Sequence, residues 1–518
     1  MSDEQPLARR AVGGLAYLFL GQGGQMLVQL ITLPILARLI APESFGLVAA
    51  TFVVVNMAFL LSTAGLSTAL IKLETMRPEH LRVALTMQVG AAVVVFGGVA
   101  LAAGRIGDAL RLDGLAPVLQ VMALAYFVRT LSLGDVVLSR QLRFRPLAVI
   151  QLVGYVVGYG VVTVGLAAAG WGVWALTGGH LVASVAQIVL LWLVAPHPFL
   201  PLLRRGPARD LLGTGLGYTI SHAGYIVAHE ADNLVVGRWL GAHALGLYER
   251  AYRLMRMPAS VFGHILGEVL YPSMAAVQDE RHRVRNMFCV STASLAALTV
   301  PTTVAVWLLT HEIVLLLLGP QWLPMRTALN IIVFGMYLKA SEAVTDSVIV
   351  ATGAVYRLAR LRWLYAAAVV TGAVVGQRWG LPGVATGALA AMALNTTVLT
   401  RLSLQRIDLS WSAWATLHAP AAVLTVAVGA FVWPTSQGLR GLGLPPALVL
   451  AGSLLAAAVA ILLATRLSPR WRVTTALSDL VGQLAALVTA PRSRRVVVAL
   501  LGTAHVRAAR PDAEEVPL

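Results

Sequence analysis

The stretch Asp232–Pro258, DNLVVGRWLGAHALGLYERAYRLMRMP, organises the rest of the chain. It repeats a pattern found 200 residues earlier in Ile35–Phe52, ILARLIAPESFGLVAATF. In both copies an apolar segment ends at an arginine, a short turn follows, and a Gly-Leu step opens the next apolar segment. The glycines of this step are Gly46 and Gly246. A repeat at this spacing predicts two lobes of similar build rather than a short solenoid.

The second copy also carries arginines into an apolar segment. If that helix begins near Leu245 at one membrane face, a rise of about 1.5 Å per residue puts Arg250 about 7 Å and Arg256 about 16 Å into a hydrocarbon core roughly 30 Å thick. Arginines at such depth normally face a protein interior or a wet cavity. In the alternative interpretation, Arg250 reaches back to the interface and Glu249 neutralises Arg253. Arg256 has no acidic residue nearby in the sequence.

The composition is that of a helical membrane protein with many spans. Of the 518 residues, 58% are hydrophobic and 12% are charged, and the mean hydropathy is +0.78. The net charge of +16 comes from arginines that lie between apolar segments, so it indicates membrane topology and not a nucleic-acid partner. The single cysteine, Cys289, excludes a disulfide framework and a cysteine-based metal site.

The apolar segments follow one another as six, six and two. They predict an all-α polytopic membrane protein with about 14 transmembrane helices, in two pseudo-symmetric six-helix lobes plus two C-terminal helices. The predicted parts are an N-lobe at 1–195, a cytoplasmic linker at 196–210, a C-lobe at 211–405, two extra helices at 406–465 and a basic cytoplasmic tail at 466–518.

The distribution of basic residues predicts the orientation in the membrane. With the N-terminus in the cytoplasm, the inside loops hold 19 lysines and arginines, and the outside loops hold 7. This bias favours cytoplasmic N- and C-termini. The tail, 466–518, is either a surface helix held to anionic lipid or a partly disordered basic segment.

Several polar residues lie inside the apolar segments. Gln22, Gln25 and Gln29 share one face of the first segment, where hydrogen bonding between helices is their commoner role. Arg129 lies near the middle of the fourth segment. His222 and His229 share a face of the seventh segment, but two histidines without a third ligand are poor evidence for a metal site. No metal and no cofactor are predicted.

A second charged group lies in the tenth apolar segment. Lys339, Glu342 and Asp346 share one helical face. One interpretation is a self-neutralised structural pair between Lys339 and Glu342. The other is that Glu342 or Asp346 carries a proton or cation that couples transport to an ion gradient. His229 and Glu230 complete the candidates for ion coupling.

The sequence lacks several motifs that are typical of enzymes. The sequence has no phosphate-binding Walker loop, no HExxH and no GxSxG, and no loop between spans reaches domain size. There is no room for a soluble catalytic domain, so these absences predict a membrane transporter and not an enzyme.

The motifs resemble those of a known family. In the first lobe these motifs are LARLIAPESFGLVA, STAGLSTALIK and SRQLRFRPLAVIQ, and in the second they are DNLVVGRWLGAHALGLYERAYRLMRMP, VLYPSMAAVQDE and LLLLGPQWLP. Their order and spacing resemble those of the oligosaccharide and polysaccharide flippases (Wzx-type, serving O-antigen or exopolysaccharide synthesis). These flippases belong to the multidrug/oligosaccharidyl-lipid/polysaccharide (MOP) exporter superfamily. The resemblance covers roughly residues 10–410. It implies two six-helix lobes around a central cavity that alternates between inside-open and outside-open states.

The resemblance also implies the cargo: a polyprenyl pyrophosphate carrying sugars, moved from the inner to the outer leaflet of the bacterial cytoplasmic membrane for surface polysaccharide biosynthesis. Arginine suits pyrophosphate because it stays charged and offers a planar fork of donors. We therefore expect Arg129, Arg253 and Arg256 to line the cavity, and Arg250, nearer the surface, to form an outer contact. Expected partners are membrane lipid, the polysaccharide polymerase and the export machinery.

Three alternatives remain from the sequence. A lipid II-type flippase of the same superfamily would also use a cationic cavity. A cation-coupled multidrug exporter predicts acidic and aromatic cavity residues. A membrane-embedded glycan polymerase or ligase, of another class, needs a large outside loop that this chain lacks.

Overall fold

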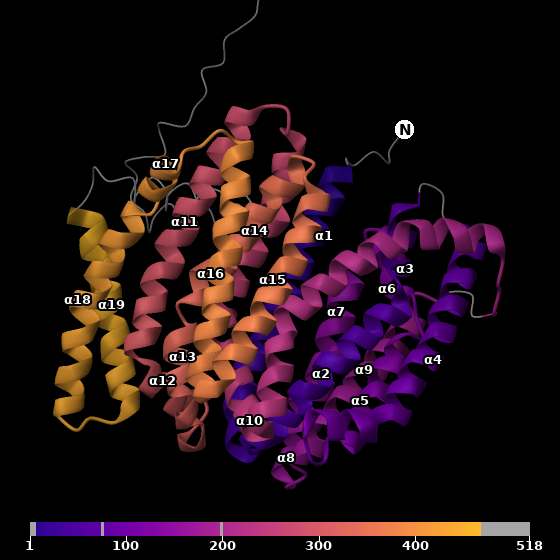
Figure 1. Cartoon of the computed structure of the whole chain (residues 1–518), viewed down its shortest axis with the longest axis horizontal. Coiled ribbons are helices and arrows are strands. Elements are labelled where there is room, and N and C mark those ends of the chain that lie inside the picture. The colour runs from indigo at the N-terminus through magenta and orange to yellow at the C-terminus, as the bar shows by residue number, and fades with distance from the viewer. Residues whose placement is uncertain (1–6, 74–76, 197–199, 468–518) are drawn as a thin grey trace, which may run out of the picture.

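The computed structural model describes residues 7–73, 77–196 and 200–467, and within these ranges all regular elements are helical. Two halves stand side by side, the N-terminal helices on the right of Figure 1 and the C-terminal helices on the left. The first half comprises α1 (Leu7–Leu39), α2 (Pro42–Thr63), α3 (Leu66–Lys72), α4 (Pro78–Leu110), α5 (Leu115–Arg129), α6 (Gly134–Arg140), α7 (Phe144–Tyr155), the π-helix η1 (Val156–Thr163), α8 (Val164–Ala168) and α9 (Val173–Val194).

The second half begins with the long α10, which starts inside the predicted linker. Its elements are α10 (Arg205–Ala276), α11 (Arg281–Leu308), α12 (Thr310–Leu317), η2 (Pro320–Met325), α13 (Arg326–Ile332), α14 (Gly335–Ala351), α15 (Val355–Gly376), η3 (Gln377–Trp379) and α16 (Gly380–Arg406). Three further helices follow: α17 (Trp411–Thr416), α18 (Ala419–Gly441) and α19 (Pro446–Leu467). The predicted tail, 466–518, lies almost wholly outside the described residues.

Within α10 the chain reverses at a single residue. Gly241 has φ 86° and ψ 173°, which is not helical and is open to glycine because it has no Cβ. The Tyr248 hydroxyl donates to Asp232 Oδ2 at 2.7 Å, although the two residues are 16 apart. In a straight helix they would be about 24 Å apart. The seventh and eighth predicted spans are therefore antiparallel neighbours, and the expected turn between them shrinks to Gly241.

The two copies of the repeat meet at their glycines. A Cβ on Gly46 would lie 1.9 Å from the Ala242 carbonyl oxygen, and a Cβ on Gly246 would lie 1.8 Å from the Pro42 carbonyl oxygen. Pro42 and Ala242 are themselves separated by the repeat distance of 200 residues. Each copy thus makes the same backbone contact with the other, as a pseudo-two-fold axis requires. The predicted pseudo-symmetry of the two halves is confirmed at this crossing.

Further contacts between the halves close the same end of the molecule. Trp322 is fully buried, and its Nε1 donates to the Ala37 carbonyl at 2.8 Å. Gln321 Nε2 donates to the same carbonyl. Arg38 Nη2 donates to the Leu316 carbonyl at 2.8 Å. The end of α1 is therefore tied to the segment between α12 and α13 of the other half.

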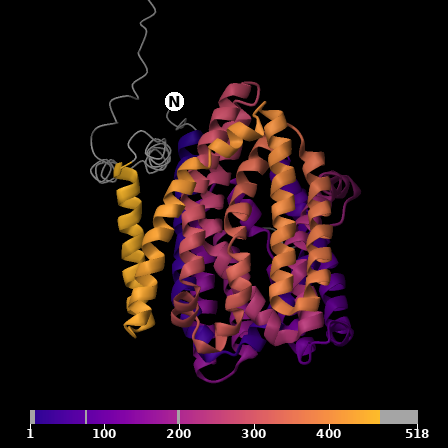
Figure 2. The same ribbon diagram turned by 60° about the vertical axis from the view of Figure 1, so that its left-hand side comes forward.

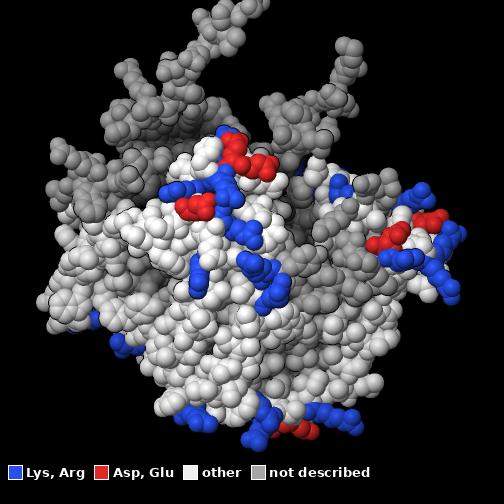
Figure 3. Space-filling model, turned by 45° about the horizontal axis from the view of Figure 1, so that its top comes forward, with Lys and Arg blue, Asp and Glu red and all other residues white. Residues whose placement is uncertain are grey.

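The spans are apolar at their outer faces and polar within. Among the described residues, eight helical segments are long and apolar enough to cross a membrane, or nine if the bent pair α5–α6 is one span. This count does not confirm the predicted 14: α14 has only 17 residues, and the counted segment Arg357–Arg406 combines α15 with α16. Figure 3 shows charged side chains gathered mainly at the two ends of the molecule, with a largely uncharged surface between them.

The two extra helices stand at the outer edge of the second half (Figure 2). Here α18 packs against α11, and α19 packs against α12. Arg440 near the end of α18 forms two 2.8 Å hydrogen bonds to the Glu312 carboxylate and a third, of 3.0 Å, to the Leu308 carbonyl. The extra helices are thereby fixed to the second half.

Candidate functional site

A cavity of about 490 Å³ lies between the two halves. Its volume falls in the range of about 300–1,000 Å³ that is usual for small-molecule sites. One wall comes from the first half and the other from the two antiparallel parts of α10. The lining residues are Gln29, Ala49, Phe52, Asn56, Tyr126, Tyr155, Tyr159, His229, Glu230, Asp232, Asn233, Glu249, Tyr252, Arg253, Arg256 and Met257.

The two walls differ in chemistry. Every charged lining residue belongs to α10, and the first half contributes aromatic rings and the amides of Gln29 and Asn56. Two of the intramembrane acids are distant from the arginines in the sequence but not in the structure. Glu230, Asp232 and Glu249 line the same cavity as Arg253 and Arg256. The reversal at Gly241, where the sequence predicts a short turn, brings them together.

The arginines of the opening stretch occupy different positions. Glu249 lies between two of them: its Oε1 accepts from Arg253 Nε at 3.0 Å, and its Oε2 lies 3.1 Å from Arg250 Nε. Arg253 lines the cavity and keeps 42% of its side chain exposed. Arg250 is buried, with its guanidinium 4.2 Å from the centre of the Phe45 ring. It therefore lies between the halves, and its expected outer contact with the cargo stays a prediction.

Arg256 is the lining arginine with the fewest partners. Its guanidinium lies 5.8 Å from the centre of the Tyr252 ring, and no carboxylate of the described residues forms an ion pair with it. Arg129 lies 5.3 Å from the ring centres of both Phe59 and Tyr126. Tyr126 lines the cavity, but Arg129 is not among the lining residues. The structure thus brings Arg253 and Arg256 together and leaves Arg129 at the flank of the cavity, behind Tyr126.

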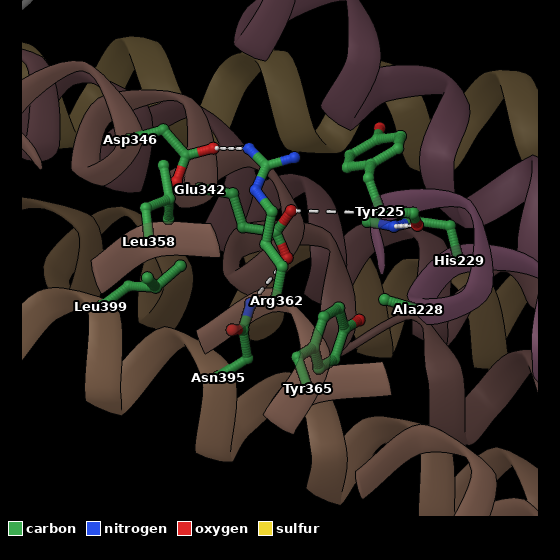
Figure 4. Close-up of a pocket in the computed structure, with 10 residues that line it drawn as sticks. All are labelled: Tyr225, Ala228, His229, Glu342, Asp346, Leu358, Arg362, Tyr365, Asn395 and Leu399. Atoms are coloured by element: carbon green, nitrogen blue, oxygen red, sulfur yellow. Dashed lines mark hydrogen bonds and ion pairs between the residues drawn. The ribbon is translucent and has the colours of Figure 1, made fainter. Parts of the chain in front are cut away.

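A second polar cluster lies within the second half. Lys339 Nζ donates to Glu342 Oε2 at 2.8 Å and contacts His229 Nε2. Asn395 Nδ2 donates to Glu342 Oε1 at 3.2 Å. One turn further along α14, Asp346 Oδ2 accepts from Arg362 Nη2 at 2.9 Å (Figure 4). The cluster contains two acids and two permanent bases, so its formal charges balance.

This cluster surrounds a cavity of about 20 Å³, enough for one water molecule. His229 lines both cavities and therefore connects them. Asp346 Oδ1 is buried and has no hydrogen-bond partner among the described residues. Glu230, the remaining coupling candidate, accepts from Asn233 Nδ2 at 3.0 Å on the wall of the large cavity.

Sequence reasoning missed two members of this cluster. Arg362 was counted with the basic residues of a cytoplasmic loop, because it follows two other arginines, but it pairs with Asp346 inside the second half. Asn395 could not be singled out from the sequence as a member of this cluster, since an amide side chain in an apolar helix is common. The histidines we considered for a metal are engaged otherwise: His229 Nδ1 lies 2.7 Å from the Tyr225 carbonyl oxygen, and His222 stacks on the Tyr225 ring.

Comparison with known proteins finds a matching family and several relatives of this chain. Residues 35–327 match the model of the polysaccharide biosynthesis protein family. The chain is 28% identical over 336 residues to the succinoglycan biosynthesis transport protein ExoT of Rhizobium meliloti (strain 1021). This alignment covers 61% of this chain and 64% of that protein. The chain thus spans just under two thirds of that relative. It is 25% identical over 379 residues to the lipopolysaccharide biosynthesis protein WzxC of Escherichia coli (strain K12), covering 71% and 75%.

A solved structure shares the fold. The lipid II flippase MurJ in an inward closed conformation matches with a TM-score of 0.71 at 11% sequence identity, over 87% of this chain and 98% of that one. Two pseudo-symmetric helical halves around a polar cavity define a multi-pass membrane transporter. The chain belongs to the polysaccharide biosynthesis protein family, in line with the resemblance to polysaccharide flippases found in its motifs.

Proposed function

We propose that this transporter moves a polyprenyl-pyrophosphate-linked oligosaccharide from the inner to the outer leaflet of the bacterial cytoplasmic membrane by alternating access. The family and the relatives named for succinoglycan and lipopolysaccharide biosynthesis support a polysaccharide cargo. The charge count of the loops supports cytoplasmic termini, so the closed end where Gly46 meets Gly246 faces outside. The polyprenyl tail stays in lipid, and the polymerase and export machinery receive the product.

The arginines on the cavity wall carry the proposal. Within 249–256 the cavity wall carries the guanidinium groups of Arg253 and Arg256 and the single carboxylate of Glu249, so this stretch of the wall has a net positive charge. Arg250 and Arg253 share Glu249, whereas Arg256 has no ion-pair partner among the described residues. A pyrophosphate supplies the missing anion, and arginine donors pair well with its oxygens. Arg253 and Arg256 bind the pyrophosphate, Arg129 contacts the cargo as it passes Tyr126, and Arg250 holds Glu249 in place.

Substitution of Arg256 tests this assignment. Arg256→Ala removes the charge and the fork, and we expect it to abolish most surface glycan in a deletion strain at equal membrane level. Arg256→Lys keeps the charge but loses the fork, so we expect partial glycan. Arg105→Ala, which changes an exposed arginine outside the cavity, is the matched control. Near-normal glycan from an Arg129→Ala, Arg253→Ala, Arg256→Ala triple variant would refute pyrophosphate binding by these arginines.

The cluster around α14 is the proposed site of ion coupling. Asp346 is the ion-carrying group, because one of its carboxylate oxygens is buried without a partner beside a cavity large enough for one water. Lys339, Glu342 and His229 hold the cluster together, and Glu230 links it to the cargo wall through His229 and the shared cavity lining.

One observation favours a second candidate function. The three carboxylates and the aromatic rings of the cavity are what a cation-coupled multidrug exporter of the same superfamily would present. That function predicts energy-dependent efflux of a lipophilic cation such as ethidium from cells that express the protein. Ethidium efflux that survives in the Arg256→Ala variant would support the exporter over the flippase.

A further inference from the structure

The aromatic wall of the cavity has no role in binding a pyrophosphate. Phe52, Tyr126, Tyr155 and Tyr159 all belong to the first half, opposite the charged wall of α10. A pyrophosphate needs positive charge beside it, which these four side chains do not supply. The wall therefore requires a different ligand group, and its chemistry is that of a flat apolar surface edged with neutral hydrogen-bonding groups.

A local irregularity of the backbone positions two of the rings. Tyr155 immediately precedes the π-helix η1, and Tyr159 lies within it. Their rings stack with centres 4.8 Å apart and planes 20° apart. A π-helical segment is rare and often marks a functional site. Thr163 Oγ1 donates to the Gly158 carbonyl at 3.0 Å, inside the widened turn.

Close packing makes this platform rigid. A Cβ on Gly158 would lie 2.4 Å from the Cβ of Ala183, and a Cβ on Gly179 would lie 1.8 Å from Thr163 Oγ1. The π-helix is therefore pressed against α9 with no room for a side chain at either glycine. A rigid, preformed surface loses little conformational freedom when a ligand binds to it.

The hydrogen bonds of the wall leave some groups free for a ligand. The Tyr159 hydroxyl lies 3.0 Å from His180 Nδ1, and the Tyr126 hydroxyl donates to Asn56 Oδ1 at 2.9 Å. These two hydroxyls are thus engaged within the wall. The Tyr155 hydroxyl, the Asn56 Nδ2 amino group and the Gln29 amide have no partner among the described residues, although all three residues line the cavity.

We infer that the wall formed by Gln29, Asn56, Tyr155 and Tyr159 binds the sugar residue next to the pyrophosphate, with a ring face of the sugar lying on the stacked tyrosines. A pyranose has an apolar face of C–H groups and a rim of hydroxyls, so it matches an aromatic surface edged with amides. The pyrophosphate then lies against Arg253 and Arg256 on the opposite wall. This inference rests on the proposed function, since it extends the same site to a second part of the cargo.

The subsite also gives the cavity carboxylates a role. Glu230 uses one oxygen to accept from Asn233, which leaves its other oxygen available to a hydroxyl donor. A carboxylate is an acceptor for sugar hydroxyls and repels a pyrophosphate. The acids therefore bind sugar hydroxyls while the arginines bind phosphate, and the two groups of charges fix the orientation of the cargo.

Binding to the full-length protein in lipid nanodiscs tests the subsite. The probes are undecaprenyl pyrophosphate and the same lipid carrying one glucose, one galactose or one N-acetylglucosamine. In the wild type we expect at least one sugar to raise affinity over the sugar-free lipid. Tyr155→Ala should reduce this gain by about three- to ten-fold, the value of one aromatic contact. Tyr155→Phe should keep most of it, and Tyr337→Ala, the same change outside the cavity, should leave it intact.

Arg256→Ala separates this inference from the proposed function. It should weaken the sugar-free and the sugar-bearing lipids by the same factor. If Arg256→Ala does so but the wild type gains nothing from any sugar, or Tyr155→Ala leaves the gain unchanged, the sugar subsite is wrong and the flippase proposal stands. If the wild type binds none of the lipids, the proposed function fails and the subsite fails with it. Thermal unfolding of each variant confirms that it is folded.

Discussion

Arg250 and Arg256 belong to the same helix, α10, but their positions give their charges different surroundings. Arg250 is enclosed by protein: the Phe45 ring covers its face and Glu249 lies at its edge. Arg256 lines a cavity and has no carboxylate at ion-pair distance among the described residues. The first charge is compensated within the fold by the Glu249 carboxylate. In the proposed function the second charge binds an external anion, because an uncompensated charge in a span is costly unless a partner or water reaches it.

The balanced cluster around α14 leads to a prediction at the same scale. Glu342→Gln alone leaves the buried Lys339 charge without its carboxylate, so we expect a loss of about 3–5 kcal/mol in unfolding free energy. Adding Lys339→Met removes the stranded charge and should restore most of the stability. We expect the double variant to transport at near wild-type rate. A double variant that is folded but inactive would show that this pair carries the coupling ion.

Asp346→Asn is the companion measurement. The amide preserves an acceptor for Arg362 but cannot exchange a proton as a carboxylate does. If Asp346 carries the coupling ion, transport by the folded variant should slow and lose its dependence on external pH, and the lost ion pair with Arg362 should lower the melting temperature. Transport with the wild-type pH profile would exclude Asp346 from coupling.

Some of these residues were predictable from the sequence and some were not. Depth along an apolar helix was enough to single out Arg253 and Arg256. The helical spacing of Lys339 and Glu342 predicted their pairing. The partner of Arg250 was not predictable, since Phe45 belongs to the other half and only the crossing of the halves brings it near. Sequence spacing gave the periodicity within each helix, but contacts between helices depend on packing that no local pattern encodes.

At the scale of elements, the largest departures from the sequence occur where the backbone is irregular. Gly241 replaces a whole turn, since one residue at positive φ is enough to reverse a helical chain. The π-helix η1 lies inside a segment that reads as an ordinary apolar span. Neither the break at Gly241 nor the π-helix follows from hydropathy. Hydropathy indicates which segments lie in the membrane but not the hydrogen-bond pattern of the backbone. Both occur on the cavity wall or next to it.

The attachment of the extra helices gives a prediction for an element. Burial works to raise the pKa of Glu312, but the hydrogen bonds from Arg440 outweigh it and hold the pKa below its usual value of about 4.3. A depressed pKa in the folded state contributes stability above that value, and the contribution is lost as pH falls through the folded pKa. Arg440→Ala should therefore destabilise the protein by about 1–3 kcal/mol at neutral pH.

Thermal unfolding of the detergent-solubilised protein measures this effect. The difference in melting temperature between the wild type and Arg440→Ala should shrink as the pH is lowered towards 4. Arg378→Ala, which removes an exposed arginine, should behave as the wild type at every pH. A difference that stays constant with pH would mean that the ion pair does not hold α18 in place.

At the scale of the whole molecule, the repeat and the closed end are one feature. Gly46 and Gly246 touch each other's backbone at the pseudo-two-fold axis, and the cavity residue Ala49 lies one helical turn beyond Gly46. Interiors packed this closely do not absorb added atoms without movement. A methyl group on either glycine must therefore push the two halves apart at this end. In the proposed alternating-access cycle, access to the cavity from this side requires the same separation of the halves, so we propose that this contact acts as the gate of the closed end.

Gly46→Ala should shift the transporter towards the state that is open at this end. In a Cys289→Ala background with Ala49→Cys as the reporter, we expect Gly46→Ala to increase labelling by a membrane-impermeant thiol reagent applied outside whole cells, and to lower surface glycan. The mirror change, Gly246→Ala, should act alike, because its Cβ would meet the Pro42 carbonyl in the same way. Gly90→Ala is the matched control, since open space surrounds that glycine. Unchanged labelling in both variants would show that the halves do not separate at this crossing. Labelling that increases only in inside-out vesicles would place this end in the cytoplasm and reverse the proposed orientation.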